Sequence, residues 1–221
     1  MHPGWSCLAA AAVEQTAQED VLSQELSDSV SEAASRVWWA RVLLHHTHTL
    51  GLKIPNSEAA SPVKVLSACT GSFAEGACFK ELGIPMTCVS ASEPNMSFQK
   101  FAKANHSALH WHSTMQDQLQ GAACVLHAGE SCRCEIVPCD YMVLGTPCNP
   151  FSVMSPKRFH DGSVKAHAQT VHTFGDVWRM LVKFNPPTAT MEQTEGFTMA
   201  ESKTVKAAPL DRLGPRREFD L

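Results

Sequence analysis

A cysteine follows a short apolar run in the stretch "DYMVLGTPCNPFS". Apolar residues that lead into Gly-Thr-Pro predict a buried strand and then a rigid turn, and Cys148 lies in that turn. A thiol at the tip of a turn is open to whatever binds above the sheet. Because the thiolate is the nucleophilic form of cysteine, such a position suits covalent catalysis. Cys148 is therefore the first candidate catalytic residue.

Carboxylates end two other predicted strands. The β-rich run "PMTCVSASE" ends in Glu93, and "PTATME" ends in Glu192. Asp117 follows a third strand that we expect over Ala108–Ser113. The carboxyl ends of parallel strands form the edge of a sheet where ligands bind, and an acid there can accept hydrogen bonds from both hydroxyls of a ribose. These acids predict a site for a nucleoside-containing ligand.

The body of the chain alternates between strand and helix patterns. After the first strand, "VKVLSAC", the sequence predicts helices in "SFAEGACFKELG" and "PNMSFQKFAKAN", a strand over Tyr141–Thr146 and a long helix over Val164–Phe184. This alternation predicts a mostly parallel sheet between two layers of helices, an α/β/α sandwich. Residues 1–61 predict an acidic, partly helical extension and linker, residues 62–197 the core, and residues 198–221 a divergent tail.

The motifs taken together resemble the cytosine-5 DNA methyltransferases. "PCNPFS" resembles the catalytic "PCQxFS" motif of that family, and "LSACTGSFAEGACFKELGI" resembles its first, cofactor-binding motif. "ASEPN", "QD" and "PPTATMEQTEGF" are similar to its second, third and sixth motifs. Because the motifs stand in the family's order over about 135 residues, the match is more specific than any single motif.

The resemblance implies a Rossmann-like fold that binds S-adenosyl-L-methionine and methylates cytosine carbon 5 in DNA. Cys148 would attack carbon 6 of the base, and Glu192 would contact ring nitrogen 3. The base must leave the duplex to reach the thiol. The implied protein is intracellular and nuclear. The expected cofactor-binding residues are Gly71, Phe73, Glu75, Glu93, Pro94 and Asp117.

Several features depart from the family pattern. Cys69 and Ser72 stand where glycines are usual, and Gln193 and Thr194 follow Glu192 in place of Asn and Val. The Arg-rich motif and the recognition domain that follow in the family are missing, so we expect a truncated domain whose isolated activity on DNA is low. A tRNA cytosine-5 methyltransferase and a non-catalytic, methyltransferase-like remnant stay open as alternatives.

The truncation also predicts an open sheet edge. In the resembling fold, the strand that ends in Glu192 pairs with another strand on its far side, and here only a proline-containing tail follows. We therefore expect self-association or a protein partner at this edge.

The cysteines and the net charge limit which compartment, nucleic-acid partner and metal site the chain can be expected to have. Nine cysteines without a signal-peptide pattern predict reduced thiols in an intracellular protein, and no apolar window is long enough for a membrane span. The net charge of −4 provides no basic excess for binding nucleic acid. Neither the "HHTHT" stretch nor the cluster of Cys124, Cys132, Cys134, Cys139 and His127 has a standard zinc spacing, so we predict no metal site.

Overall fold

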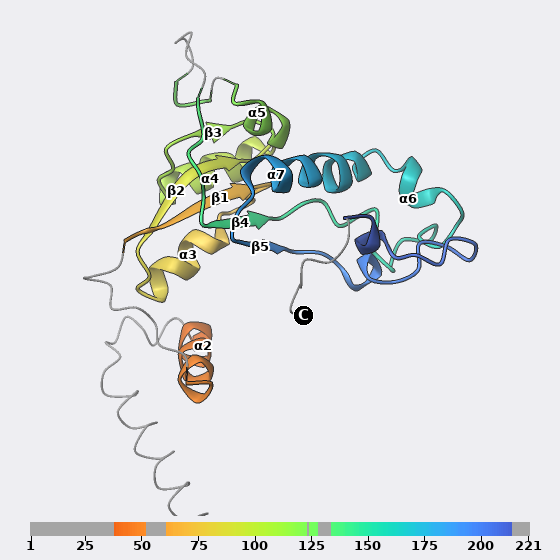
Figure 1. Cartoon of the computed structure of the whole chain (residues 1–221), viewed down its shortest axis with the longest axis horizontal. Helices are drawn as coiled ribbons and strands as arrows, with labels where there is room; N and C mark the ends of the chain where they lie inside the picture. Colours follow the sequence, from red (N-terminus) through yellow and green to blue (C-terminus); the bar gives the residue numbers. More distant parts are fainter. Residues whose placement is uncertain (1–37, 52–60, 123, 128–133, 214–221) are drawn as a thin grey trace, which may run out of the picture. The chain divides into compact units, whose positions relative to one another are not determined.

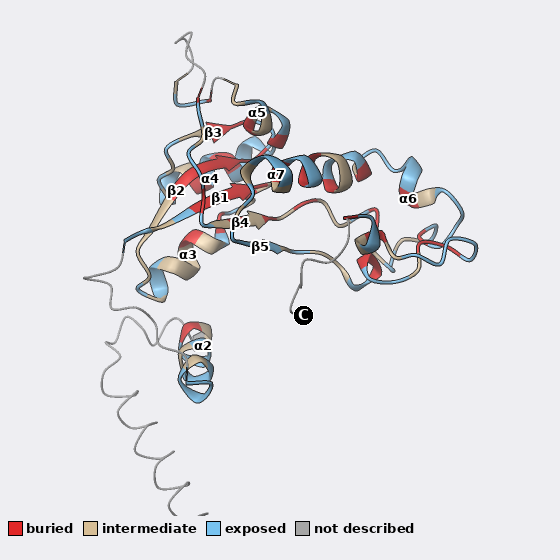
Figure 2. Ribbon diagram, viewed as in Figure 1, coloured by how far each residue is buried: buried red, intermediate tan, exposed pale blue. Residues whose placement is uncertain are grey.

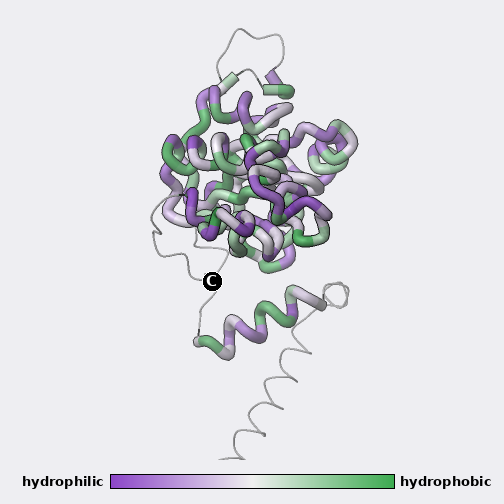
Figure 3. Tube along the Cα trace, turned by 90° about the vertical axis from the view of Figure 1, so that its right-hand side faces the viewer, coloured by the Kyte–Doolittle hydropathy of each residue, from purple (hydrophilic) through white to green (hydrophobic). Residues whose placement is uncertain are grey.

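The computed structural model describes residues 38–51, 61–122, 124–127 and 134–213. The chain divides into two compact units, residues 1–54 and 55–221. The described part of the first unit contains helix α2 (Trp38–Thr49), along which hydrophobic and hydrophilic segments alternate (Figure 3). The rest of the predicted acidic helix, over residues 20–37, lies outside the described residues.

The second unit is built on a five-stranded sheet in which all paired strands are parallel (Figure 1). The strands lie in the order β3-β2-β1-β4-β5, so the order reverses direction between β1 and β4. The mixed α/β fold and the parallel sheet predicted from the alternating pattern are thereby confirmed. The strands are β1 (Val63–Ala68), β2 (Met86–Ser92), β3 (Trp111–His112), β4 (Tyr141–Leu144) and β5 (Thr188–Met191).

The central strand β1 is buried along most of its length because it pairs with β2 on one side and β4 on the other. Val65, Leu66 and Ala68 are fully buried, as expected of a parallel strand with both faces covered. Burial is concentrated in the middle of the sheet, where β1 and β2 are drawn largely in red (Figure 2).

Two separate hydrophobic clusters show that both faces of the sheet are covered. One joins Leu66 and Met142 of the sheet to Met180 of α7, and the other joins Ala91 to Phe73 and to Ala102 of α4. The sequence therefore folds into three layers, with the sheet in the middle. The helical elements are α3 (Ala74–Glu81), α4 (Met96–Asn105), α5 (Met115–Gln120), α6 (Ser163–Ala166), the π-helical turn η2 (His172–Asp176) and α7 (Val177–Phe184).

Two predicted elements differ from the structure. The helix expected over Val164–Phe184 is wrong in its continuity, because α6 ends at Ala166 and His167 has an extended backbone with φ −72° and ψ 128°. Helical structure resumes beyond it and runs through η2 into α7. The third strand is only two residues long, shorter than the predicted Ala108–Ser113.

Strand β5 lies at one edge of the sheet and pairs only with β4 among the described residues. From residue 198 to residue 213, the described chain forms turns and the 3₁₀ helix η4 (Pro209–Leu213), without a further strand. An edge strand presents unpaired backbone groups that another chain can pair with. Self-association at β5 stays a prediction.

The turn between β1 and α3 contains two non-glycine residues with left-handed backbones. Cys69 has φ 54° and Phe73 has φ 63°, a region that is unfavourable for residues with a Cβ atom. The Cys69 carbonyl packs closely against Gly145, because a Cβ atom at position 145 would lie only 2.8 Å from the carbonyl oxygen. Cys69 therefore occupies a position that favours glycine.

We predict that Cys69→Gly makes the protein more stable than Cys69→Ala by about 1 kcal/mol, because only glycine adopts this backbone without strain. Both variants remove the thiol, so the comparison isolates the effect of the Cβ atom. Urea unfolding followed by circular dichroism measures the difference. Equal stability of the two variants would show that the left-handed turn is not strained.

Candidate active site

The carboxyl ends of β1, β4 and β5 are held together by backbone hydrogen bonds. The Gly145 amide donates to the Ala68 carbonyl at 3.0 Å, and the Glu192 amide donates to the Leu144 carbonyl at 3.0 Å. The loops that contain Gly71, Cys148 and Glu192 consequently start from neighbouring points on one edge of the sheet. This edge lies where the strand order reverses, the usual place for a ligand in open α/β sheets.

Glu93 is fixed at the end of β2 by two backbone amides. One carboxylate oxygen accepts from the Gly71 amide at 2.7 Å, and the other accepts from the Asn95 amide at 2.7 Å. The residue is only 6 % exposed, so its carboxylate is oriented rather than mobile. Glu93 links the turn after β1 to the turn after β2. Sequence reasoning placed Glu93 and Gly71 at one edge of the sheet, and the structure brings them into direct contact.

Two buried glutamines support this region, and sequence reasoning missed both. The Gln99 side chain donates to the carbonyls of Glu93 and His112, at 3.1 and 3.3 Å. Gln118 donates to the Ser67 carbonyl at 3.1 Å, and its own side-chain oxygen accepts from the Ser92 hydroxyl at 2.7 Å. Because the amides satisfy buried polar groups on β1, β2 and β3, they fix the relative positions of these strand ends. A polar residue inside an amphipathic helix gives no sequence signal of this role.

Pro94 and Asp117 differ in how they are placed. Pro94 is exposed directly after Glu93, so its ring is available to pack against a ligand. Asp117 lies in the first turn of α5, where its carboxylate accepts from the Thr114 hydroxyl at 2.7 Å while its amide donates to the same hydroxyl at 3.0 Å. This pair is a helix cap, which is an ordinary structural role for an acid at that position.

Glu75 and Phe73 have their side chains turned into the protein. The Glu75 carboxylate accepts a hydrogen bond from the buried Ser67 hydroxyl, and burial raises the pKa of Glu75 even though hydrogen bonds oppose that shift. The Phe73 ring is fully buried and packs edge-on against His106 and Trp111, with centroids 5.0 and 6.0 Å away. A ring without exposed surface offers nothing for an adenine to contact. Both side chains support the turn from inside.

Cys148 lies in a compact turn after β4. Its carbonyl accepts from the amides of Phe151 and Ser152, at 2.9 and 3.1 Å, and the residue is half-buried. Burial raises the pKa of two other thiols, that of Cys69 to about 11 and that of Cys88 to about 12. Those two cysteines stay protonated at neutral pH and are poor competitors as nucleophiles.

Glu192 is exposed at the end of β5, on the side of β4 and the Cys148 loop. The next residue, Gln193, donates from its side chain to the carbonyl and the hydroxyl of Thr146, at 2.9 and 3.0 Å. These bonds tie the segment after β5 to the segment that leads into Cys148. Gln193 therefore has a clear structural role.

Arg158 locks the Cys148 loop in place, and sequence reasoning did not identify it. Its guanidinium is 1 % exposed and donates to the carbonyls of Phe151, at 3.0 Å, Glu201, at 2.6 Å, and Gly196. The acceptors belong to the loop after Cys148, the tail and the turn after β5. One arginine thus joins three segments that are distant in the sequence.

Aromatic packing supports the same junction. Phe151 stands edge-on to Phe197, with ring centroids 4.8 Å apart, and to Phe174 of η2, with centroids 5.6 Å apart. The fit is tight, because a Cβ atom on Gly196 would overlap the Phe151 carbonyl oxygen. The Cys148 loop therefore rests on a rigid apolar base.

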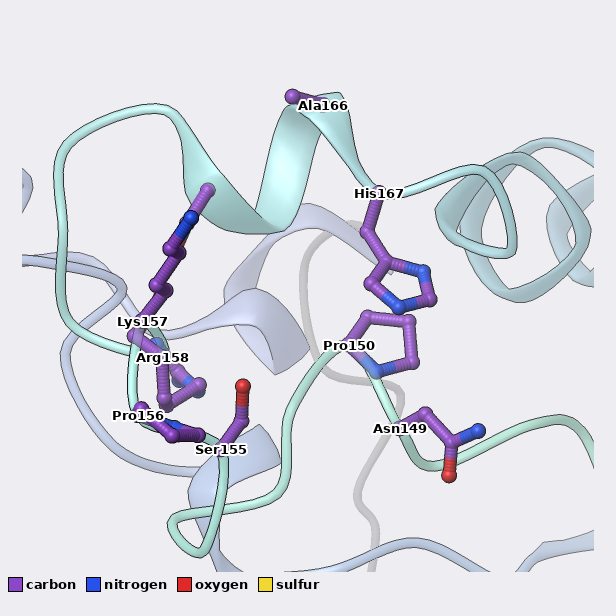
Figure 4. Close-up of a pocket in the computed structure, with 9 residues that line it drawn as sticks. Asn149, Pro150, Ser155, Pro156, Lys157, Arg158, Ala166 and His167 are labelled. Atoms are coloured by element: carbon purple, nitrogen blue, oxygen red, sulfur yellow. The ribbon is translucent and has the colours of Figure 1, made fainter.

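A cavity of about 420 Å³ opens beside the Cys148 loop (Figure 4). Asn149 and Pro150 form one wall, and the His167 imidazole points towards Pro150 from the end of α6. Lys157 and His167 are its available basic residues, because the Arg158 guanidinium is buried against three carbonyls, and no acidic residue lines the cavity. A cavity with this lining suits an anionic or polar ligand.

No protein-family model matches the chain, and no curated protein matches it. In the described parts of the chain, no helix is long and apolar enough to cross a membrane.

We predict that Arg158→Lys lowers the free energy of unfolding by about 2–4 kcal/mol, because an ammonium group cannot reach three separate carbonyls and leaves buried acceptors unsatisfied. Urea unfolding measures the change. The exposed Arg179 provides a matched control, and Arg179→Lys should change stability by less than about 0.5 kcal/mol. Equal stability of the two variants would show that the Arg158 guanidinium does not hold the three segments together.

His112 should make the free energy of unfolding depend on pH. The ring is fully buried, its nitrogens have no hydrogen-bond partner among the described residues, and burial, with a smaller contribution from His110, lowers its pKa from 6.5 to about 4. Between pH 6.5 and pH 4, the His112 imidazole is protonated in the unfolded chain and neutral in the folded chain. Stability due to this group therefore falls as the pH drops from 6.5 to 4, by up to about 3 kcal/mol.

His112→Gln should remove that part of the pH dependence, because glutamine does not titrate. Thermal unfolding of the variant and the wild type across this pH range measures the difference, with the exposed His160→Gln as the control. Parallel stability curves for His112→Gln and the wild type would contradict the prediction.

Proposed function

We propose that this chain contains the catalytic core of a DNA (cytosine-5)-methyltransferase that uses S-adenosyl-L-methionine. The observation that carries the proposal is the convergence of the Gly71, Cys148 and Glu192 loops at one edge of a parallel sheet, where the strand order reverses. This arrangement is the one expected of a Rossmann-like methyltransferase, with a nucleotide side and a chemical side at the same edge.

The residues at the ends of β1 and β2 fit the cofactor. Glu93 is buried and oriented, which suits a carboxylate that accepts ribose hydroxyls. A Cβ atom on Gly71 would meet nothing within 4 Å, so this turn has open space in which a ligand can approach the backbone. Pro94 adds an exposed apolar surface. Bound S-adenosyl-L-methionine would supply an electrophilic methyl group.

The residues on the other side of the edge would act on the cytosine. The Cys148 thiolate adds to carbon 6, which makes carbon 5 nucleophilic enough to take the methyl group. Glu192 contacts ring nitrogen 3 and stabilises the charge that develops there during the attack. Water then takes the proton from carbon 5, the C–H electrons form the double bond to carbon 6, and the carbon 6–sulfur bond breaks, which releases the Cys148 thiolate. The basic cavity beside Asn149 and Pro150 is available to a phosphate or to the flanking nucleotides.

The two alternatives predict different behaviour at Cys148. A tRNA cytosine-5 methyltransferase would carry out the same chemistry on RNA, and a non-catalytic remnant would bind the cofactor without forming a bond to the base. The test therefore uses 5-fluorocytosine, which blocks the final elimination and traps the adduct. Placing the base in a mismatch lowers the energy needed to extrude it.

We predict a cofactor-dependent covalent adduct between the chain and mismatched DNA that contains 5-fluorocytosine, detected as a band shift on denaturing gels. Cys148→Ser should abolish the adduct, and Cys78→Ser, on α3, should leave it unchanged. Glu192→Gln should slow its formation roughly 10²–10⁴-fold. An adduct with RNA alone would favour the tRNA enzyme. Binding of S-adenosylhomocysteine without an adduct on either nucleic acid would favour the remnant.

A further inference from the structure

Four potential metal ligands gather away from the candidate active site. The ligand atoms of His110, Cys124, His127 and Cys134 all lie within 4.8 Å of one another. The two cysteines are buried and the two histidines are half-buried. Neither cysteine forms a disulfide. Two thiols and two imidazoles therefore meet at one point, although they come from three separate parts of the chain.

The distances match the size of a tetrahedral zinc site. The Cys124 sulfur lies 3.0 Å from His127 Nδ1 and 3.8 Å from His110 Nδ1, and the Cys134 sulfur lies 3.4 Å from His127 Nδ1. With Zn–S and Zn–N bonds of usual length, ligand atoms at the corners of a tetrahedron stand about 3.3–3.8 Å apart. These three distances lie within about half an ångström of that geometry, and no two of the four ligand atoms are more than 4.8 Å apart.

The ligand types select among the metals. Thiolate sulfur and imidazole nitrogen suit zinc, whereas calcium and magnesium take oxygen ligands, and no carboxylate belongs to this cluster. Four protein ligands fill a tetrahedral shell and leave no position for a substrate, which is the mark of a structural site. The amide of Cys124 also donates to the Cys134 sulfur at 3.3 Å, a hydrogen bond that stabilises a bound thiolate.

We propose that His110, Cys124, His127 and Cys134 bind one structural zinc ion. The ion joins His110, directly before the edge strand β3, to Cys124, His127 and Cys134 on the connection between α5 and β4. That connection already lies beside β3, because the Val125 amide donates to the Trp111 carbonyl at 2.6 Å. Zinc therefore fastens the long α5–β4 connection to the outer edge of the sheet.

The zinc site could not be predicted from the sequence for two reasons. His110 stands far upstream of the cysteines, so no spacing rule connects it to them. Cys139, which sequence reasoning grouped with Cys124 and Cys134, instead belongs to the hydrophobic core near Met142. Cys132 lies outside the described residues. The remaining signal is the short Cys124-x-x-His127 spacing, which becomes informative only when the fold brings in the other two ligands.

We predict that the full chain, purified with zinc and then freed of loosely bound metal, contains one zinc ion per molecule by plasma mass spectrometry. Cobalt substitution should produce the visible absorption bands of a tetrahedral, thiolate-ligated ion. Cys124→Ser should weaken zinc binding at least about tenfold, and Cys78→Ser, a matched control outside the cluster, should bind zinc like the wild type.

Zinc release from the wild type tests the same ligands without relying on variants that could fail to fold. Stepwise modification of the thiols with a mercurial reagent, followed with a zinc-sensitive dye, should release the ion as two cysteines react, and peptide mapping should identify them as Cys124 and Cys134. A chelator should lower the melting temperature, and added zinc should restore it. Absence of zinc from the wild type, a Cys124–Cys134 disulfide, or undiminished binding by Cys124→Ser would each overturn the proposal.

Discussion

The geometry of the candidate active site depends on the buried guanidinium of Arg158. A charged group in an apolar interior is unfavourable unless its hydrogen bonds are satisfied, and burial lowers the pKa of this guanidinium. Three backbone carbonyls offset that penalty, and they come from the three segments that must be aligned. The requirement to satisfy one buried cation therefore sets the position of the Cys148 loop relative to the turn after Glu192.

The cofactor side of the edge is organised differently. There, the side-chain amides of Gln99 and Gln118 and the carboxylate of Glu93 link the strand ends through hydrogen bonds. These bonds are directional and uncharged apart from Glu93, so they keep the strand ends in register. The candidate site thus combines two kinds of support, a buried cation under the reacting loop and an amide network under the nucleotide side.

The sequence predicted the parts of the structure that follow from local pattern. The runs that became β1, β2, β4 and β5 were recognisable from their β-rich composition, and Glu93 could be placed because it ends a strand. Side-chain direction could not be read from the sequence. Phe73 and Glu75 lie in the expected turn, yet both face inward, because a left-handed residue redirects the chain there. Asp117 could equally serve as a cap or as a ligand.

The long-range partners were also beyond the sequence. Arg158 stands in a polar stretch that resembles an exposed loop, and its acceptors are up to 43 residues away. At the break after Ala166, the Val164 carbonyl accepts from the His167 amide and from the Thr170 hydroxyl, and these bonds replace the one that a continuous helix would give it. Such contacts depend on the folded arrangement and leave no periodic trace.

The π-helical turn η2 interrupts the α-helical repeat just before α7. Each hydrogen bond in such a turn spans one residue more than in an α-helix, so the helix widens and the side chains on either side of it fall out of phase. Within the turn, Phe174 packs against the rings of Phe151 and Phe197, and Met180, beyond the turn, belongs to the same hydrophobic cluster beneath the sheet. The extra residue in the turn brings Phe174 and Met180 to one cluster, so a single helix both supports the Cys148 loop and covers the sheet.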